Sequence, residues 1–380
     1  MALIDEDIIK DLLYPERRIE LFLNIDKLLK KLAASLQINY KRLSLNDSNY
    51  IPILFYRKSK SSAPFILIQG AQHNEYNGTF GIIDYLSSKN VESLLEWCEN
   101  TSGGFCFIPI LNVKGFLNPI KENKYGYYTN NPRGINNNEK TLNTNRFWDK
   151  TVEYKILNAS KYNIPEENRL LGNFLLDIRE VKNTPRSKFI ILDFHETSLP
   201  YKFRKEMEIK FDTDYSIRDH WLKGWILETV LLYKSIPFIN KVSKPVVKLV
   251  RDALSDLNKD IDLKTVYFLL FTPHSRKFAQ YISNKVENIF KTKLWFSTKY
   301  CFYHKYPLNG CYCTANMNRP WINAIEIEAR KIFFDLEKER NNFENINWYK
   351  DHLISHLTLN SKIASKIIKL AIDYLNMLEN

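Results

Sequence analysis

The sequence predicts an α/β fold with a mixed, largely parallel central sheet flanked by helices. Short apolar runs at residues 64–68, 105–111 and 189–192 have the length of buried strands. Between them lie stretches with apolar residues at helical spacing, at 78–88, 91–99 and 164–177. Because strands that alternate with helices usually pair side by side in one sheet, this order predicts a sheet covered by helices.

The remaining segments add helices at both ends and one further strand. Residues 5–38 show helical spacing that Pro15 divides into two helices, and Tyr40–Tyr56 alternates around an Asn-Asp-Ser-Asn turn typical of a hairpin. Residues 321–328 alternate as a strand, and the chain is helical from about residue 344. Helical patches at 221–234 and 266–289 predict a mostly helical insertion. We therefore expect an N-terminal helical segment (1–38), a main α/β domain (39–200 and 301–343), a helical insertion (201–300) and a C-terminal helical segment (344–380).

Composition is that of a globular protein, with 380 residues, 44% of them apolar and 26% charged. No run reaches 18 apolar residues, so we expect no membrane partner. The N-terminus is acidic and has no basic leader, which argues against a secretory signal. Five scattered cysteines are unlike a disulfide framework. These observations together predict a cytoplasmic protein.

The chain is basic, with a net charge of +12 and a pI near 9.2. Its lysines and arginines are spread along the chain, and no motif combines them with aromatic residues in the manner of a nucleic-acid site. We therefore expect no nucleic-acid partner. The charge favours an acidic substrate. The sequence leaves the oligomeric state open.

Groups that bind metal or move protons gather at the ends of three predicted strands. His73 and Glu75 follow the first strand, and Asp193 and His195 end the second, where residues two apart share one face. The third strand carries carboxylates at Glu326 and Glu328. Two histidines and one carboxylate leave a coordination position of a tetrahedral Zn²⁺ open for catalysis, and a further glutamate can carry a proton.

Four motifs in order resemble the zinc carboxypeptidase superfamily, which includes the aspartoacylase and succinylglutamate desuccinylase branch. Gly70-Ala71-Gln72-His73-Asn74-Glu75 is similar to the family's G-x-H-x-x-E, and Asp193-Phe194-His195 is similar to its D-x-H. Asn145-Arg146 matches the N-R pair, and Ile325-Glu326-Ile327 matches the late strand that carries the catalytic glutamate. The resemblance covers roughly residues 64–200 and 320–330.

The resemblance implies a role for each matching residue. His73, Glu75 and His195 would bind Zn²⁺, and Asn145 with Arg146 would hold the substrate carboxylate. Glu326 would be the catalytic base, with Glu328 as the alternative that lacks a following apolar residue. Arg133 would polarise the scissile carbonyl, as an upstream arginine does in the family, with a plain loop arginine as the alternative.

The first motif departs from the family pattern, because Gln72 stands at the family's histidine position and His73 comes one residue later. His73 and Glu75 are then two apart, so they share a face only on an extended backbone. Either a rebuilt turn lets His73 bind the metal, or Gln72 lies at the site and metal binding is weakened or lost.

The function expected from these residues is zinc-dependent hydrolysis of an amide bond beside a free carboxylate. A metallocarboxypeptidase acting on a peptide C-terminus is the first expectation. An aspartoacylase-like deacylase of an N-acyl amino acid is the second. The competing class is a non-catalytic binding or scaffold protein that keeps the fold without the metal.

Overall fold

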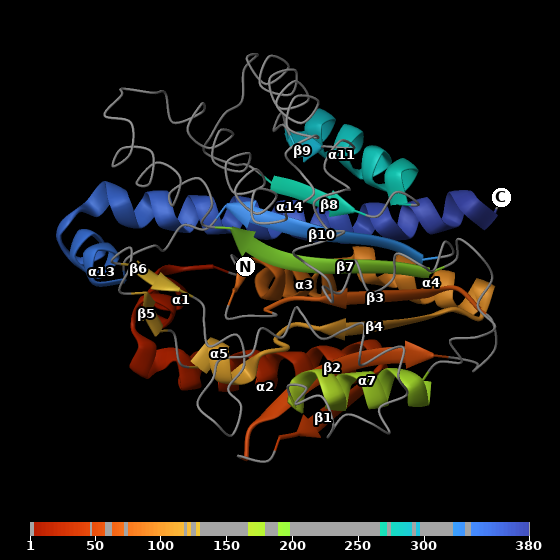
Figure 1. Ribbon diagram of the computed structural model, residues 1–380, viewed down its shortest axis with the longest axis horizontal. Helices are drawn as coiled ribbons and strands as arrows, with labels where there is room; N and C mark the ends of the chain where they lie inside the picture. Colours follow the sequence, from red (N-terminus) through yellow and green to blue (C-terminus); the bar gives the residue numbers. More distant parts are fainter. Residues whose placement is uncertain are drawn as a thin grey trace, which may run out of the picture.

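A computed structural model of the chain describes residues 4–45, 48–57, 63–71, 75–117, 120–122, 127–129, 166–178, 189–197, 267–271, 275–290, 294–296, 322–330 and 336–379. Its centre is an eight-stranded sheet in the order β1-β2-β4-β3-β7-β10-β8-β9 (Figure 1). The strands span Asn39–Ser44 (β1), Tyr50–Arg57 (β2), Phe65–Gln69 (β3), Gly104–Ile108 (β4), Phe189–Thr197 (β7), Tyr267–Phe271 (β8), Leu294–Phe296 (β9) and Ile322–Arg330 (β10). Ile120–Glu122 (β5) and Tyr127–Thr129 (β6) form a separate two-stranded sheet.

The middle of the large sheet is parallel and its flanks are mixed. Strands β4, β3, β7 and β10 pair in parallel. Strands β1, β2 and β8 are antiparallel to their inner neighbours, and β9 pairs in parallel with β8. This arrangement confirms the predicted α/β class with a mixed, largely parallel sheet. It also brings the carboxyl ends of β3, β7 and β10 to one edge, which is where open α/β sheets place their sites.

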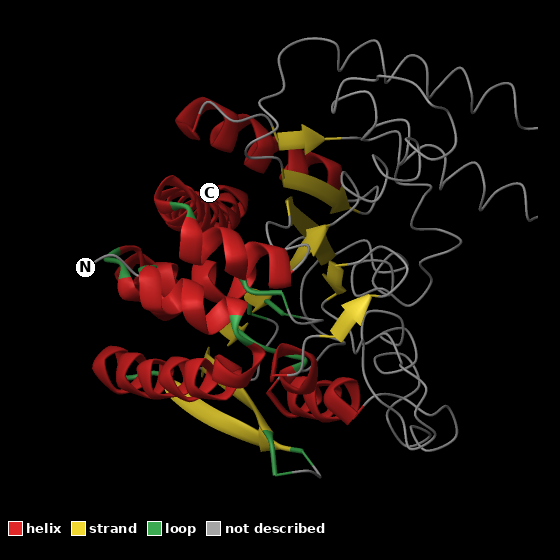
Figure 2. Cartoon of the chain, turned by 90° about the vertical axis from the view of Figure 1, so that its left-hand side faces the viewer, coloured by secondary structure: helices red, strands yellow, loops and turns green. Residues whose placement is uncertain are grey.

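Helices cover both faces of the sheet. The described helices are Glu6–Leu13 (α1), Arg18–Leu36 (α2), Asn77–Ser87 (α3), Asn90–Thr101 (α4), Val113–Leu117 (α5), Glu166–Ile178 (α7), Arg276–Phe290 (α11), Leu336–Asn345 (α13) and Asn347–Glu379 (α14), with a 3₁₀ turn at Pro15–Arg17 (η1). Helices α2, α3, α4 and α14 lie on one face and α7 on the other (Figures 1 and 2). Every residue of β3 and β4 is buried. Strands covered on both faces in this way have the unbroken apolar runs seen in the sequence.

Helix α3 lies between the sheet and α14, and two glycines make this packing possible. A Cβ added at Gly78 would lie 2.4 Å from Phe194 Cβ on β7, and one added at Gly81 would lie 2.3 Å from Ala364 Cβ on α14. Carbon atoms in contact are normally about 3.5–4.0 Å apart, so only glycine allows this approach. The Ser361 hydroxyl also donates to the Phe80 carbonyl at 3.1 Å, which joins α14 to α3.

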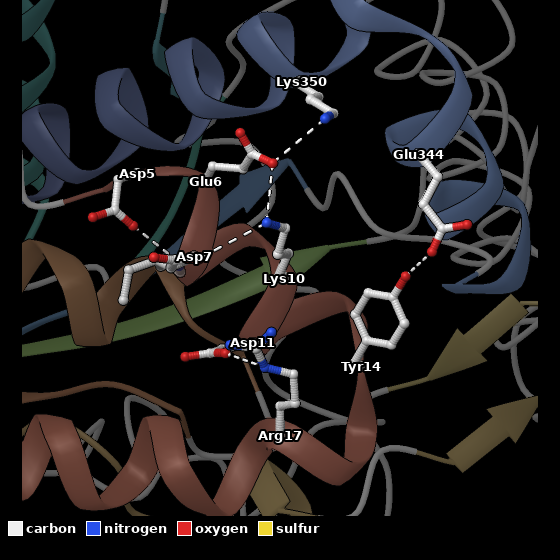
Figure 3. Close-up of polar contacts among 10 residues, drawn as sticks. Asp5, Glu6, Asp7, Lys10, Asp11, Tyr14, Arg17, Glu344 and Lys350 are labelled. Carbon is white, nitrogen blue, oxygen red and sulfur yellow. Dashed lines mark hydrogen bonds and ion pairs between the residues drawn. The ribbon is translucent and has the colours of Figure 1, made fainter.

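The N-terminal helices form as the sequence predicts and contact the C-terminal ones. The Asp5 side chain accepts a hydrogen bond from the Ile8 amide and caps α1. Pro15 begins the 3₁₀ turn that separates α1 from α2. Lys350 Nζ lies 3.4 Å from Glu6 Oε1, and the Tyr14 hydroxyl donates to Glu344 (Figure 3). These contacts join the two ends of the chain.

The predicted hairpin is the antiparallel pair β1–β2, and a buried carboxylate attaches it to α2. Asp26, which is 2% exposed, accepts hydrogen bonds from the Tyr40 hydroxyl and from Arg42 of β1. Lys30 Nζ lies 3.2 Å from the same carboxylate. Burial alone raises the pKa of Asp26, but Arg42, Tyr40 and Lys30 outweigh burial and hold this pKa below its ordinary value.

Part of the expected helical insertion belongs to the sheet. The pattern at 266–289 predicts a helix, which is correct for α11 and wrong for residues 267–271. These five residues form β8, which pairs with β10, and β9 adds a further strand beyond it. A five-residue apolar run fits a helix or a strand equally well, and the neighbouring strand decided between them. The expected domain boundaries stay a prediction.

None of the helices within the described residues is both long and apolar enough to cross a membrane.

Candidate metal centre

The candidate centre lies on β7 and β10 in the middle of the sheet. Asp193 and His195 are two residues apart on β7, so their side chains leave the same face of the strand. The parallel register places Glu326 of β10 opposite Asp193, and Glu328 opposite His195. Asp193, His195 and Glu326 are 0%, 3% and 4% exposed. The register therefore brings a buried histidine and two buried carboxylates together from distant parts of the sequence.

These three side chains are close enough to share a cation. One ligand atom from each of Asp193, His195 and Glu326 lies within 4.8 Å of the other two. Within the described part of the chain, this is the one such group of three or more histidine, cysteine or acidic side chains. Imidazole and carboxylate are both common zinc ligands. The fold thus carries a candidate His/Asp/Glu metal site in its core.

Glu75, in the turn between β3 and α3, contacts His195 of this group. It is 2% exposed, and its Oε1 lies 3.4 Å from His195 Nδ1. Two ligands of a tetrahedral zinc ion, with bonds of about 2.0–2.1 Å, lie about 3.3–3.4 Å apart. The spacing of Oε1 and Nδ1 therefore fits two ligands of one zinc ion.

Asp193 determines how the His195 ring is oriented. Its Oδ2 lies 3.0 Å from His195 Nε2, and its Oδ1 accepts a hydrogen bond from Gln69 Nε2, also at 3.0 Å. A histidine that binds a metal usually donates its other ring N–H to a carboxylate in this way. Asp193 thereby keeps the proton on Nε2 and leaves Nδ1, the nitrogen beside Glu75, to bind a cation.

The charges of the centre also suit a cation. Burial alone lowers the pKa of His195, but Asp193 and Glu75 outweigh burial and hold it well above its ordinary value. Burial raises the pKa of Asp193, and His195 opposes that rise. Asp193 and Glu75 thus both favour a positive charge on the His195 ring. A divalent cation that takes the place of its Nδ1 proton preserves the attraction to Glu75.

The structure places some of the residues predicted from the sequence and leaves others outside its description. Glu75 and His195 come together, and Glu326 lies in the same cluster. The backbone of Glu328 is described but its side chain is not. His73, Arg133, Asn145 and Arg146 lie outside the described residues, so their roles stay predictions. Gln72, the alternative to His73, lies outside them as well.

Two residues of the centre were absent from the predicted site residues. Asp193 contacts His195 directly, and Gln69 donates a hydrogen bond to Asp193. The spacing of Asp193 and His195 shows that they share a face, but it does not show which ring nitrogen Asp193 contacts. Gln69 is a single polar residue at the end of an apolar strand. Such a residue is a usable signal, because a buried amide needs a hydrogen-bond partner. The partner itself is defined by the β3–β7 register, which pairs Gln69 with Asp193.

Comparisons with known proteins find similarity in fold and none in sequence. No protein-family description matches the chain, and no curated protein matches it at a significant level. A candidate metallopeptidase from Shewanella amazonensis matches at 13% identity over 90% of this chain and 92% of the other, with a TM-score of 0.42. A metallo-carboxypeptidase from Burkholderia cenocepacia matches at 7% identity over 92% of this chain and 68% of its own length, with a TM-score of 0.45.

A third solved structure is a metallo-carboxypeptidase from Pseudomonas aeruginosa in complex with (2-guanidinoethylmercapto)succinic acid. It is 11% identical over 91% of this chain and 68% of the other, with a TM-score of 0.42. These solved metallopeptidase structures are what the chain is similar to, and at TM-scores below 0.5 the similarity carries no argument about its function. At these identities the similarity concerns the fold alone, and any function has to be argued from the site.

Proposed function

We propose that this protein is a zinc-dependent hydrolase that cleaves an amide bond beside a free carboxylate, with a carboxypeptidase as the first candidate. The observation that carries the proposal is the pairing of Glu75 Oε1 with His195 Nδ1 at 3.4 Å, next to the buried carboxylate of Glu326. Zinc-assisted hydrolysis requires three protein ligands and a general base, and this cluster supplies two candidate ligands with a buried carboxylate beside them.

In this proposal Glu75 and His195 hold the zinc ion, with His73 as the third ligand. A bound Zn²⁺ supplies Lewis-acid chemistry to the substrate carbonyl and to water. Glu326 accepts the proton of the attacking water and donates it to the leaving amine. Asp193 keeps His195 in the tautomer that this arrangement needs. Burial of the cluster strengthens each of these interactions, because the effective dielectric constant inside a protein is low.

Substrate binding in this proposal falls to Asn145 and Arg146, which match the family's N-R pair, and to Arg133, which matches no motif and is chosen only because the family has an upstream arginine. Arg146 offers a planar pair of donors to a carboxylate, and Asn145 assists through its amide. Arg133 polarises the scissile carbonyl. The net charge of +12 supports a substrate that is itself acidic, such as a glutamate-rich C-terminus or an N-acyl acidic amino acid.

The first test is the zinc content of the purified protein, measured by elemental analysis beside His195→Ala and His73→Ala. We expect about one zinc per chain in the wild type. We expect it to be lost from both variants. If His73→Ala kept its zinc while His195→Ala lost it, His73 would be removed from the ligand set. Absence of zinc from the wild type, even after reconstitution, would leave the non-catalytic alternative.

The second test is a substrate screen with Glu326→Gln as the matched variant. C-terminal peptides and N-acyl amino acids are compared, each with acidic, neutral and basic members. The proposal expects Glu326→Gln to keep zinc and lose roughly a hundredfold or more of kcat, as expected for a general base. Cleavage of N-acyl amino acids alone would favour the deacylase, and preference for neutral or basic substrates would refute the acidic specificity.

A further inference from the structure

Glu196 follows His195 on β7 and reaches the first turn of α3. Its Oε1 accepts hydrogen bonds from the Tyr76 and Asn77 amides, both at 2.9 Å, and the residue is 9% exposed. Tyr76, at the N-cap position of α3, makes no capping hydrogen bond with its own side chain. The first amides of a helix have no partner within the helix. A residue of the sheet therefore provides the cap that α3 lacks.

This contact connects the two segments that carry the candidate zinc ligands. Tyr76 directly follows Glu75, and Glu196 directly follows His195. Successive side chains of a strand point to opposite faces, so Glu196 leaves β7 on the side of α3 while His195 faces Glu75. Phe194, which shares the face of Glu196, is the residue that Gly78 of α3 closely approaches. The hydrogen bonds thus fix the backbone immediately after Glu75 relative to the backbone immediately after His195.

Two positively charged groups lie beside the Glu196 side chain. The first is the amino end of α3, where aligned peptide dipoles favour an anion. The second is Arg18 at the start of α2, which is 1% exposed and is attracted electrostatically to Glu196. The Arg18 Nε donates to the Leu12 carbonyl at 3.1 Å, and its guanidinium lies over the Phe116 ring at 5.3 Å. Burial lowers the pKa of Arg18 to about 10, so it remains a cation at neutral pH.

We propose that Glu196 is a positioning residue of the metal centre. Its carboxylate holds the Glu75 turn against β7 and so sets the separation between Glu75 and His195. This inference rests on the proposed function for its zinc readout, but the hydrogen bonds that it invokes belong to the metal-free protein. Glu196 itself binds neither the metal nor the substrate. Catalytic sites need their groups held within about 0.5 Å, so release of the turn should weaken zinc binding.

The test compares three substitutions that separate reach from charge. Glu196→Ala removes the acceptor, Glu196→Asp keeps the charge but shortens the side chain, and Glu196→Gln keeps an oxygen at the same reach without the charge. Zinc affinity is measured by competition with a chromophoric chelator. We expect affinity to fall roughly tenfold or more for Ala and for Asp, and to stay within about threefold of wild type for Gln. Should the Ala variant fail to fold, the Asp and Gln variants still decide the question.

Hydrogen exchange of the metal-free protein gives a readout that does not depend on zinc. In the Ala and Asp variants we expect the amides of Tyr76 and Asn77 to exchange about tenfold faster or more, because they lose their acceptor. In Glu196→Gln they should exchange as in the wild type. Asp5→Ala is the matched control, because Asp5 also caps a helix, at α1. It should speed exchange at Ile8 and leave zinc affinity unchanged.

The outcomes separate this inference from the proposed function. Wild-type zinc affinity and wild-type exchange in Glu196→Ala and Glu196→Asp would overturn the positioning role. Faster exchange with unchanged zinc affinity would overturn it as well, since the turn would then be free without consequence for the metal. A wild-type protein that binds no zinc would refute the proposed function, while exchange would still show whether Glu196 holds the turn.

Discussion

Substitution of Gly78 by alanine should weaken the metal centre although Gly78 contacts no metal. The new Cβ would lie 2.4 Å from Phe194 Cβ, more than about 1 Å inside normal contact. Neither atom can move by turning a side chain, because both are attached directly to the backbone. Helix α3 and strand β7 must therefore separate by about 1 Å. That displacement moves the turn that carries Glu75 away from the strand that carries His195.

The expected magnitudes follow from two opposing effects. Overpacking of this kind costs about 1–3 kcal/mol, and the helix propensity gained from glycine to alanine returns about 1 kcal/mol. We expect a net loss of at most roughly 2 kcal/mol in the free energy of unfolding, measured with urea. A shift of about 1 Å exceeds the tolerance of a metal site, so zinc affinity should fall roughly tenfold or more.

Gly81→Ala is the matched control. Gly81 lies on the same helix, and its added Cβ would meet Ala364 Cβ of α14 at 2.3 Å, so the clash is equally severe. It forces α3 away from α14 and not away from β7. We expect a similar loss of stability with zinc affinity within about threefold of wild type. If the two variants lose affinity equally, or if neither does, the argument that β7–α3 packing sets the site is refuted.

Two further predictions concern buried carboxylates. Asp193→Asn should lower zinc affinity about 10–100-fold, because it removes the charge that orients His195. The new amide can be accommodated, because Gln69 Oε1 has no hydrogen-bond partner among the described residues and can turn to accept from it. Asp26→Asn should destabilise the protein by roughly 2–4 kcal/mol at pH 7. The pKa of Asp26 is lowered in the folded protein, so its contribution is present above the ordinary value and is lost as pH falls. The stability gap between Asp26→Asn and wild type should therefore close below about pH 4.

Each of these predictions has a result that contradicts it. Loss of zinc affinity well beyond a hundredfold in Asp193→Asn would make Asp193 a direct ligand, and unchanged affinity would remove it from the centre. For Asp26, urea unfolding from pH 7 down to pH 3 decides the matter. A gap that stays constant over this range would show that its charge is not what joins α2 to β1.

The sequence by itself determined the local elements and the chemistry available at their ends. Runs of apolar residues predicted β3, β4 and β7, helical spacing predicted α3, α4 and α7, and an alternating segment with a polar turn predicted the β1–β2 hairpin. It also showed that Asp193 and His195 share a face, because side chains alternate along any strand. Each of these inferences depends on neighbours within a few residues, and periodicity records such neighbours directly.

Only the tertiary structure decided which distant groups meet. The β7–β10 register places Glu326 opposite Asp193, and a slip of one residue would have turned Glu326 to the other face. The same holds for Gln69 beside Asp193, for Glu196 at the start of α3, and for the apolar run that became β8 at the side of β10. These pairings are set by how complete strands and helices pack against one another. No short stretch of sequence contains that information, so the metal centre could be proposed from its motifs but assembled only by the fold.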